Sequence, residues 1–354
     1  MQPLASIIIV SYNKRDDIVR CLRSVLKTSE SAFEIIVVDN ASTDGSADAV
    51  VETFPDVITI RSETNLGFGG GCNLGVSHAS ASCLVFLNPD TVVDSGWLEP
   101  LVSATSAITG IDSPSAVGLA TSKILMLREP GRINTCGNTV HITGLTLCRG
   151  LGAPDSSFAD DDEVDAVSGA AFAIRRDVFE ALGGFDESMF LYMEDTDLSL
   201  RARLAGWQSV CIPRSRVFHD YSLKMFPLKV FYQERNRYLM LLKSFKWATL
   251  LVLAPALLIA ELITWAFVLL YDRRNVANKA RAYAWVVNNW PAILQARRAT
   301  QSLRRIRDNE LLRQTSFRLE LGQARGGGIA RLAQQVLDPL FWVLRRLALA
   351  LVRW

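Results

Sequence analysis

The chain has 354 residues, of which 49% are hydrophobic, and this is enough to bury the core of one large domain or of two ordinary ones. The net charge of +2 hides an asymmetry, because residues 273–354 carry 16 Lys and Arg against 4 Asp and Glu, whereas residues 1–272 carry 22 against 32. A basic tail on an acidic body favours an anionic partner for the tail, either a membrane or a nucleic acid. The six cysteines show no CxxC pair or regular spacing, so neither a zinc site nor a disulfide framework is indicated, and reduced cytosolic thiols are expected.

The first hundred residues alternate between predicted strands and helices. The N-terminal run "SIIIVSYN" lacks the features of a signal peptide and predicts a strand over Ser6–Tyr12, followed by a helix that ends near Lys27. A strand ending at Asp39, a helix after the "TDG" turn and a strand over Val57–Arg61 come next. A Gly-rich loop, a further helix and a strand that ends at Asp90 complete the series.

This alternation predicts an α/β fold with βαβ units and a mostly parallel, Rossmann-like sheet flanked by helices. Ligands of such sheets bind at the carboxyl ends of the strands. Polar residues of this chain gather at those ends: Tyr12 and Asn13, Asp39 and Asn40, and Asn88 and Asp90.

The middle of the chain is less regular. Over residues 104–165 the pattern loosens into Gly, Ser and Thr, and the acidic run "DDDE" is expected to be a solvated loop. The segment "VDAVSGAAFAIRRDVFEALGG" predicts a small-residue strand and a short helix closed by Gly183. Helical spacing resumes at Glu194, so Glu194 and Asp195 fall in a first turn, where the helix dipole favours acids. His219 follows a further predicted strand, "SVCIP".

The C-terminal part changes character. Residues Trp247–Tyr271 form a 25-residue apolar stretch, interrupted by Pro255 and Glu261, that is long enough to span a bilayer. Basic residues flank it on both sides, so a single span, a Pro-bent hairpin, an in-plane helix and a buried soluble helix all stay open.

The last predicted helix is amphipathic. Its charged residues fall within an arc of about 100°, and they are Arg331, Asp338, Arg345, Arg346 and Arg353. Trp, Phe and Leu side chains cover much of the remaining surface. This pattern is typical of a helix that lies in a membrane interface, and a helix docked on the protein's own body or in a dimer is the alternative.

Two features at the strand ends suit a nucleotide. Asp39 is placed to accept a hydrogen bond from the imide N–H of uracil or thymine, and Tyr12 offers a ring face for stacking. Ordinary turn or helix-cap chemistry would explain the acid as well. The loop "NLGFGGGCNLG" lets the backbone approach a ligand closely, but it matches neither the dinucleotide fingerprint nor the P-loop, and a flexible turn explains it equally well.

Acidic residues further along suit the transfer of a group from a diphosphate. Asp90 can hold a divalent cation that neutralises the leaving group, although Pro-Asp is also a good turn pair. Glu194 and Asp195 can supply a base that removes a proton from an attacking hydroxyl. His219 is a further candidate metal ligand or a structural histidine.

In this order the segments resemble family 2 of the glycosyltransferases, which has the GT-A fold, and within it the rhamnosyltransferase-like branch. The matching segments are "IIIVSYN", "IIVVDNASTDGS", "NLGFGGGCNLG", "FLNPDT", the long segment over 167–207 and "VFHDYS". They cover roughly residues 5–245, and the tail matches only in being apolar and basic.

The resemblance implies a role for each candidate site residue. Asp39 would bind the nucleobase, Asp90 and His219 would bind the divalent metal, Mg²⁺ or Mn²⁺, and Asp195 would be the catalytic base with Glu194 beside it for the acceptor. The remaining nucleotide-binding residues would be Tyr12, Asn13, Asn65, Gly67, Phe68 and Asn73. One departure is that the family's DxD motif is Asn88, Pro89 and Asp90 here, which puts metal affinity and the ribose contact in doubt.

The implied activity is inverting transfer of a sugar, with rhamnose as the family-level candidate, from a UDP or dTDP sugar to a hydroxyl of a lipid-linked or cell-surface glycan, with a polyprenyl lipid as the expected carrier. Residues 1–228 would form the catalytic domain, and residues 229–354 a helical region that holds the enzyme to the cytoplasmic face of the membrane, as a peripheral or monotopic protein or through a transmembrane segment. A homo-oligomer stays open.

Three rival interpretations stay open to test. A processive polysaccharide synthase is disfavoured because "YQERNRYL" lacks the QxxRW pattern, and a non-catalytic sugar-nucleotide-binding scaffold because Asp90, Asp195 and His219 are all present. Binding of the basic tail to nucleic acid is disfavoured because its apolar face carries Trp, Phe and Leu, so no nucleic-acid partner is predicted.

Overall fold

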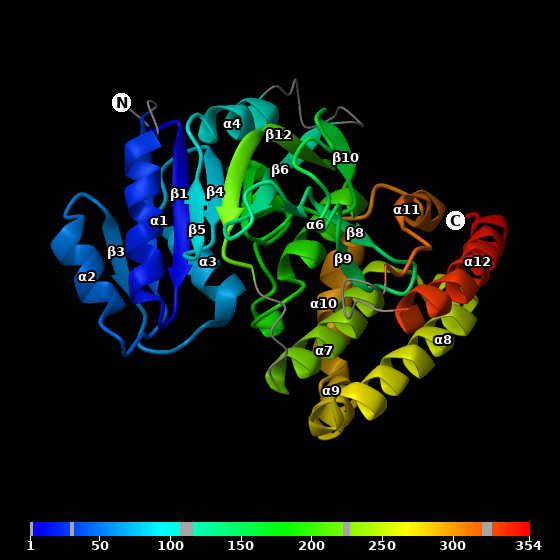
Figure 1. Ribbon diagram of the computed structural model, residues 1–354. Coiled ribbons are helices and arrows are strands. Elements are labelled where there is room, and N and C mark those ends of the chain that lie inside the picture. The colour runs from blue at the N-terminus through cyan, green and yellow to red at the C-terminus, as the bar shows by residue number, and fades with distance from the viewer. Residues whose placement is uncertain (1–2, 29–31, 107–115, 222–226, 321–327) are drawn as a thin grey trace. The chain divides into compact units, whose positions relative to one another are not determined.

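The computed structural model describes residues 3–28, 32–106, 116–221, 227–320 and 328–354 (Figure 1). The chain divides into two compact units. The first comprises Met1–Asn138, Cys148–Ala202 and Trp207–Ser222, and the second Thr139–Leu147, Arg203–Gly206 and Leu223–Trp354. Ser222 and the residues up to Phe226 lie outside the described part of the chain, so the last residue of the "VFHDYS" segment does too.

The first unit is built on a large mixed sheet. Its strand order is β10-β12-β6-β11-β4-β1-β2-β3, and β5 and β7 pair with β12 and β6. The strands are β1 (Ala5–Ser11), β2 (Phe33–Asp39), β3 (Ile58–Arg61), β4 (Cys83–Leu87), β5 (Thr91–Val93), β6 (Val117–Met126), β7 (Ile133–Thr135), β10 (Asp162–Val164), β11 (Ala171–Arg175) and β12 (Gln208–His219). Strands β1 to β4 pair in parallel, whereas β11 is antiparallel to both β4 and β6. A separate two-stranded sheet joins β8 (Asn138–Val140) and β9 (Thr146–Cys148).

Helices cover both faces of this sheet. They are α1 (Arg15–Thr28), α2 (Ser46–Thr53), α3 (Gly67–Ser77), α4 (Leu98–Ser106), α5 (Arg176–Ala181) and α6 (Glu194–Leu204), with a 3₁₀ turn, η1, over Glu187–Met189. Because strand side chains alternate, Ile7 and Ile9 of β1 pack with the apolar residues of α1, α2 and α4. Ile8 and Val10 instead face the glycines of α3. The α/β prediction, its first four strands and its first two helices are therefore confirmed.

The predicted Gly-rich loop over residues 65–75 is wrong, because most of it is helix α3. Glycine is a poor helix former, which is why the sequence indicates a loop. The helix packs so closely on β1 that a Cβ added at Gly71 would lie 2.7 Å from Val10 Cγ1, and one at Gly75 would lie 2.5 Å from Ile8 Cγ2. The glycines therefore permit the contact that stabilises the helix.

The expectation of irregular structure over residues 104–165 is wrong for β6, a ten-residue strand inside the sheet. The strand is hard to recognise because Thr121, Ser122 and Lys123 interrupt its apolar pattern, although all three are buried. Lys123 Nζ binds the backbone oxygen of Ser157 at 2.8 Å and Asp155 Oδ1 at 3.2 Å, which offsets the cost of burying its charge.

The second unit is helical. Its helices are α7 (Pro227–Ser244), α8 (Trp247–Tyr271), α9 (Val276–Asn288), α10 (Trp290–Ser302), α11 (Asp308–Gln314) and α12 (Gly328–Leu351), with a 3₁₀ turn, η2, over Arg273–Asn275. The Pro-bent hairpin is wrong, because α8 is one continuous helix with Pro255 inside it. A single proline removes one backbone hydrogen bond and can kink a helix, but it does not by itself reverse the chain.

Helix α12 confirms the predicted last helix, and its charged arc is partly engaged within the second unit. Asp338 Oδ1 accepts a hydrogen bond from the Leu319 N–H at 3.1 Å, and Arg345 Nε donates to the Thr315 oxygen at 2.8 Å. The side chain of Arg331 lies outside the described residues.

Candidate active site

The carboxyl ends of β1 and β2 lie next to each other, with Ser11 paired to Asp39. Tyr12 follows β1 and is 49% exposed, so its ring is available to a ligand. Asn13 has a positive φ of 51°, its N–H donates to Ser42 Oγ at 3.0 Å and its Oδ1 accepts from the Thr43 N–H at 2.8 Å. Asn13 therefore ties the end of β1 to the loop after β2.

Asp39 is buried and only partly satisfied. Its Oδ2 accepts a hydrogen bond from the Ser42 N–H at 3.2 Å, whereas its Oδ1 has no hydrogen-bond partner among the residues that the structure describes. A buried acceptor without a donor is costly, so this oxygen suits the N–H of a ligand.

The Gly-rich residues predicted to surround the nucleotide hold a network around the start of α3. Asn65 Oδ1 accepts from Asn40 Nδ2 at 3.0 Å and from the Gly67 N–H at 2.9 Å. Gly67 has a φ of +72°, and a Cβ there would lie 2.2 Å from the Phe190 oxygen, to which the Phe68 N–H donates at 2.8 Å. These groups fix the backbone at the end of β2.

Asn73 links α3 to the acidic loop that precedes α6. Its Nδ2 donates to the Phe185 oxygen at 3.0 Å and to Glu187 Oε1 at 2.9 Å, and its Oδ1 accepts from the Phe185 N–H at 3.0 Å. The amide is thus committed to positioning this loop, and its predicted contact with the nucleotide stays a prediction.

The backbone before Glu194 and Asp195 is strained. Phe190, Tyr192 and Met193 have positive φ values of 60°, 68° and 67°. Non-glycine residues rarely adopt this conformation, and such strain gathers at functional sites, where surrounding contacts maintain it. The strained turn delivers the two acids to the first turn of α6.

The two acids have different surroundings. Glu194 is buried, and its Oε2 has no hydrogen-bond partner among the described residues. Burial and the charge of Asp195 raise the pKa of Glu194 to about 8. Asp195 Oδ2 accepts from the Gly169 N–H at 2.8 Å and its Oδ1 from the Thr196 N–H at 2.6 Å. Burial raises the pKa of Asp195, although these two hydrogen bonds oppose the shift.

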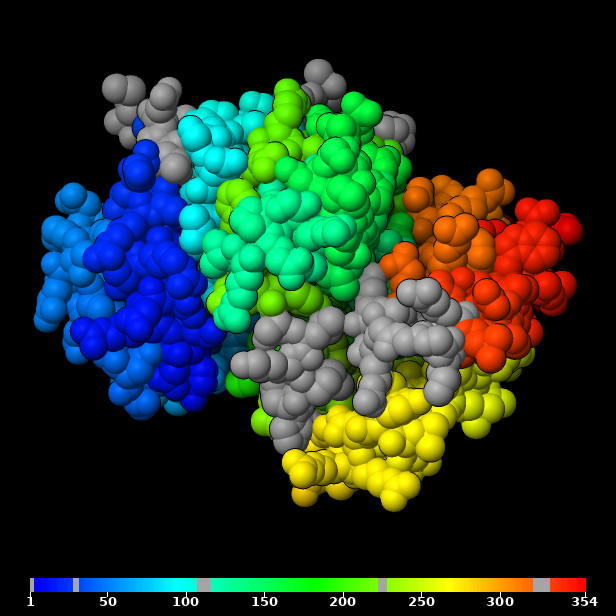
Figure 2. Space-filling model, in the orientation of Figure 1, coloured from blue at the N-terminus to red at the C-terminus, as the bar shows by residue number. Residues whose placement is uncertain are grey.

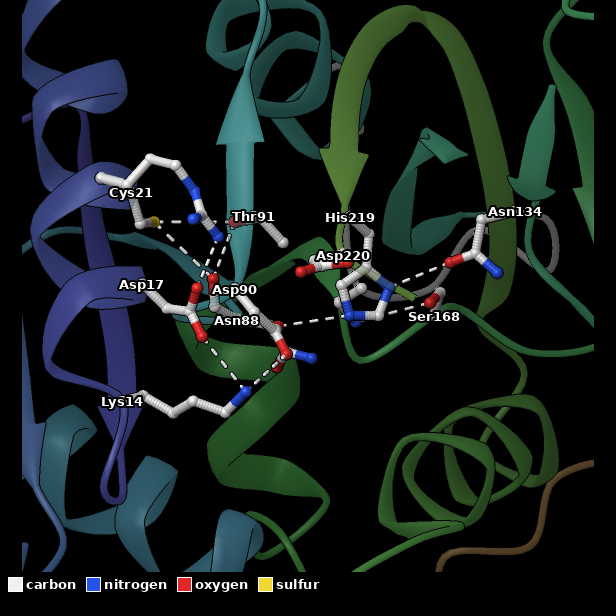
Figure 3. A network of polar contacts seen from close by, with 12 residues as sticks. Lys14, Asp17, Cys21, Asn88, Asp90, Thr91, Asn134, Ser168, His219 and Asp220 are labelled. Carbon is white, nitrogen blue, oxygen red and sulfur yellow. Dashed lines mark hydrogen bonds and ion pairs between the residues drawn. The ribbon is translucent and has the colours of Figure 1, made fainter. Parts of the chain in front are cut away.

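Asp90 lies between an imidazole and an ammonium group, as Figure 3 shows. Its Oδ1 is 3.2 Å from His219 Nε2, and its Oδ2 is 3.7 Å from Lys14 Nζ. The Oδ1 atom is buried. Burial opposes ionisation of Asp90, but His219 and Lys14 together lower its pKa. On the far side of the ring, His219 Nδ1 is 2.9 Å from Asn134 Oδ1.

The segment 168–170 connects these two groups of residues. The Ala170 oxygen accepts from the Asn88 N–H at 2.9 Å, two residues before Asp90, and the next residue back, Gly169, donates to Asp195. Figure 3 places Ser168 beside His219. The structure therefore brings Asp90, His219 and Asp195 to the same end of the sheet. Asp39 lies at this end too, since it ends β2, and only β1 separates β2 from β4.

Sequence reasoning missed Lys14, Asn134 and Gly169, which contact predicted site residues. Lys14 directly follows "SYN", so its place at a strand end was a usable signal. Asn134 and Gly169 carry no local signal, because their contacts arise from strands that are far apart in sequence. Within the described part of the chain, no group of three or more His, Cys, Asp or Glu side chains is arranged to hold a metal, so Asp90 and His219 form a pair.

The chain matches known proteins in both halves. The model of the family described as glycosyl transferase family 2 matches residues 6–109, and that of glycosyl transferase family group 2 matches residues 156–297. A relative from Mycobacterium tuberculosis, N-acetylglucosaminyl-diphospho-decaprenol L-rhamnosyltransferase, is 27% identical over 244 residues, which are 62% of this chain and 76% of that protein. The O-antigen biosynthesis protein RfbC of Myxococcus xanthus is 31% identical over 227 residues, or 61% of this chain and 17% of its own.

Solved structures agree on the fold. GalNAc-T7, solved with UDP, GalNAc and Mn²⁺, superposes with a TM-score of 0.56 at 20% identity and covers 68% of this chain and 48% of its own. Residues 1–349 of TarS from S. aureus, solved with UDP-GlcNAc, superpose with a TM-score of 0.56 at 16% identity and cover 98% of this chain and 91% of the other. The fold is thus that of a GT-A-type glycosyltransferase, followed by a helical region with one strongly apolar helix. The chain belongs to family 2 of the glycosyltransferases, in its rhamnosyltransferase-like branch.

Proposed function

We propose that this glycosyltransferase moves a hexose from a pyrimidine nucleoside-diphosphate sugar to a hydroxyl of a lipid-linked glycan, with inversion at the anomeric carbon. The observation that carries the proposal is the link through residues 168–170 between Asp195, held by the Gly169 N–H, and the Asp90–His219 pair. A base and a charge-stabilising pair at one end of a GT-A sheet are the two requirements of a single displacement.

The donor side rests on Asp39 and Tyr12. The unpartnered Asp39 Oδ1 can accept a hydrogen bond from the imide N–H of uracil or thymine, and the exposed Tyr12 ring can stack on the base. Rhamnose is the sugar we propose, because the mycobacterial relative is named as an L-rhamnosyltransferase. The decaprenol-linked acceptor in that name supports a polyprenyl-linked acceptor here.

Asp90 and His219 fit a divalent cation. Asp90 Oδ1 is 3.2 Å from His219 Nε2, and a carboxylate oxygen and an imidazole nitrogen could together hold such a cation. Two protein ligands leave room for the oxygens of the donor diphosphate. When bound, the cation would neutralise charge on the departing diphosphate.

In the proposed reaction Asp195 accepts the proton of the acceptor hydroxyl. The acceptor oxygen forms a bond to the anomeric carbon from the face opposite the diphosphate, while the bond from that carbon to the phosphate oxygen breaks and the nucleoside diphosphate leaves with the electron pair. The raised pKa of Asp195 makes it a stronger base than an ordinary carboxylate. Lys14, near Asp90, adds positive charge on the side of the leaving group.

The test is Asp195→Asn in the full chain. We expect turnover to fall about 10³-fold or more, since the variant cannot accept the proton, while UDP and dTDP bind as before. The matched control is Asp56→Asn, an exposed acid outside the site, which should retain full turnover. Calorimetry measures binding, and proton NMR of the product reports the anomeric configuration. Retained turnover in Asp195→Asn, or a product with retained configuration, would overturn the mechanism.

A further inference from the structure

Helix α8 exposes a continuous apolar stripe. Leu251, Leu258 and Leu262 are 76%, 63% and 64% exposed, and Leu269 continues the row at 47%. These positions lie seven, four and seven residues apart, which are sums of the three- and four-residue steps along a helix, so they share one face of it over about 27 Å. By length and composition α8 is, among the described residues, the one helix apolar enough to cross a membrane.

Helix α12 exposes a second stripe with the same spacing. Leu332, Val336 and Leu347 are 65%, 66% and 54% exposed, and the row continues through Leu340, Val343 and Leu351. Isolated exposed leucines are ordinary on a protein surface, but a row along the full length of a helix indicates a partner of apolar chemistry. Residues of α12 contribute to the surface in view in Figure 2, where they are red.

The two helices are antiparallel neighbours. Phe341 of α12 and Ala256 of α8 belong to one apolar cluster, and the Trp354 Nε1–H, just after α12, donates to Thr249 Oγ1 near the start of α8 at 2.9 Å. Each helix has one face that carries the exposed stripe and another that contacts the other helix. Counted in the direction of the chain at about 100° per residue, the contact face comes roughly a quarter turn after the stripe on both helices. In an antiparallel pair these two rotations have opposite senses, so both stripes face the same side and form one surface.

A charged cluster on the flank of α8, about a quarter turn from the leucine stripe, fastens α8 to α7 and α9. Glu261 lies in the middle of α8 and pairs with Arg237 of α7 and with Lys279 of α9, the latter at 3.4 Å. The hydroxyls of Tyr238 and Tyr283 also donate to Glu261. Burial opposes its ionisation, yet the charge of Arg237 and the tyrosine hydroxyls lower the pKa of Glu261 to about 2. The acid is therefore a fixed anion inside the helical unit.

This cluster is incompatible with a spanning α8. If α8 crossed a bilayer, Glu261 would lie near the midplane, and Arg237 and Lys279 would have to enter the hydrocarbon with it or leave it unpaired. A lone charge at the midplane of a bilayer is strongly unfavourable. A helix that lies parallel to the membrane keeps the cluster on its protein side and its leucines on the lipid side.

The surface charge of the unit complements an anionic membrane. Among the described residues of the second unit, the exposed charged residues are arginines, with the single exception of Glu310. They include Arg273 and Arg274 beyond the end of α8, and Arg346 and Arg353 at the end of α12. Basic residues near the surface of an anionic leaflet are attracted to it.

We propose that α8 and α12 form a monotopic docking surface that lies in the plane of an anionic bilayer, with both leucine stripes in the outer part of the hydrocarbon and no span. The proposal deepens the proposed function, since a polyprenyl-linked acceptor would present its sugar at this leaflet. A second copy of the chain on the same surface is the rival occupant, and the tests separate the two.

The first test is flotation of the full chain with vesicles that contain phosphatidylglycerol. Leu258→Glu and Leu347→Glu place a charge on each stripe at exposed positions, so both variants should fold. We expect each to lower the bound fraction at least tenfold, and the double variant to abolish binding. Leu26→Glu is the matched control, because Leu26 is 47% exposed on α1 of the other unit, and it should float like the wild type. Undiminished flotation of the double variant, or a dimer that buries the stripes and does not bind vesicles, would overturn the proposal.

The second test measures depth. A nitroxide label on a cysteine introduced at position 251, 262 or 269 reports the depth of that position in the bilayer. Labelling of the protein without an introduced cysteine gives the background signal, which should be low because all native cysteines except the partly exposed Cys148 are buried. An in-plane helix gives three similar shallow depths. A spanning helix gives a deep label at 262 and labels on opposite faces at 251 and 269, and this result would overturn the proposal.

Activity towards a soluble acceptor separates the two proposals. Leu258→Glu and Leu347→Glu should retain binding of UDP or dTDP and transfer to a water-soluble acceptor while losing vesicle binding. If the wild type floats and its labels lie at one depth but it transfers no sugar, the docking surface stands and the proposed function fails. If transfer occurs without flotation, the docking surface fails alone.

Discussion

The two units of the molecule treat buried acids in opposite ways. In the first unit, Asp39 Oδ1 and Glu194 Oε2 are buried and have no hydrogen-bond partner among the described residues. In the second, both oxygens of Glu261 are engaged by Arg237, Lys279 and two tyrosines, and Glu234 pairs with Arg237 at 2.5 Å.

The difference indicates what each group of acids is for. An unpartnered buried oxygen costs free energy that only a ligand can offset, so its retention at strand ends indicates binding and chemistry. A fully paired acid gains little from a ligand and instead fixes the packing of the helices that contribute its partners. Burial alone therefore does not identify a functional acid, whereas burial with an unused acceptor does.

The largest expected effect is the loss of a paired acid. Glu261→Gln leaves Arg237 and Lys279, each about 1% exposed, with only Glu234 as an anion. We expect the free energy of unfolding to fall by about 3 kcal/mol, the lower end of the cost of breaking a buried pair, because Glu261 keeps some solvent. Urea unfolding of the full chain measures it. Glu52→Gln, an exposed acid on α2, should change stability by less than about 0.5 kcal/mol. Equal effects of the two substitutions would break the comparison.

A buried acid without a partner should make the free energy of unfolding depend on pH. The pKa of Glu194 is about 8 in the folded protein, against an ordinary value of 4.5, because burial and Asp195 disfavour its charge. Between these values the folded state binds more protons than the unfolded state, so Glu194 makes the protein less stable as pH rises from about 4.5 to about 8. The limiting slope is about 1.4 kcal/mol per pH unit.

Glu194→Gln should flatten this dependence, because an amide does not titrate. Urea unfolding at pH 5, 6.5 and 8 measures the slope of the wild type and of the variant, and Glu52→Gln should keep the wild-type slope. If the Glu194→Gln and wild-type slopes coincide, Glu194 is not the strained acid that its surroundings indicate.

A smaller effect is expected at Asn134, which holds the far side of His219. Its Oδ1 is 2.9 Å from His219 Nδ1 and so orients the ring with Nε2 towards Asp90. Asn134→Ala should weaken Mn²⁺ binding in the presence of UDP about 10-fold to 100-fold, and Asn134→Asp should restore much of it because it keeps an acceptor oxygen. Calorimetry with Mn²⁺ is the measurement. Unchanged affinity in Asn134→Ala would show that the orientation of His219 does not depend on this contact.

How far the sequence predicts this molecule depends on where the information lies. Alternating apolar segments such as "SIIIVS" and "EIIVVD" are local signals, and they predict the first strands correctly. Helix α3 and strand β6 depend on tertiary contacts, the close approach of Gly75 to Ile8 and the burial of Lys123 beside Asp155, and local propensity gives the opposite answer.

The candidate site divides in the same way. Asp90, Asp195 and His219 stand out because a carboxylate or an imidazole at the end of an apolar strand, or in a first helical turn, is conspicuous in sequence. Asn134 and Gly169 belong to the same cluster only because β7 and the segment before β11 fold next to it. Their roles are made by backbone and amide groups that every chain contains, so no residue type marks them.

The smallest expected effect is at Gly169, whose N–H donates to Asp195 Oδ2 at 2.8 Å. A Cβ at this position would lie 3.3 Å from the same oxygen, so Gly169→Ala keeps the donor but displaces the carboxylate by a few tenths of an ångström. We expect turnover to fall about tenfold, since catalysis is sensitive to such misplacement, with stability and UDP binding nearly unchanged. Gly131→Ala, where a Cβ meets nothing within 4 Å, is the matched control. If Gly169→Ala turns over like Gly131→Ala, the hydrogen bond orients a structural acid, and the base must be sought elsewhere among the unpartnered oxygens.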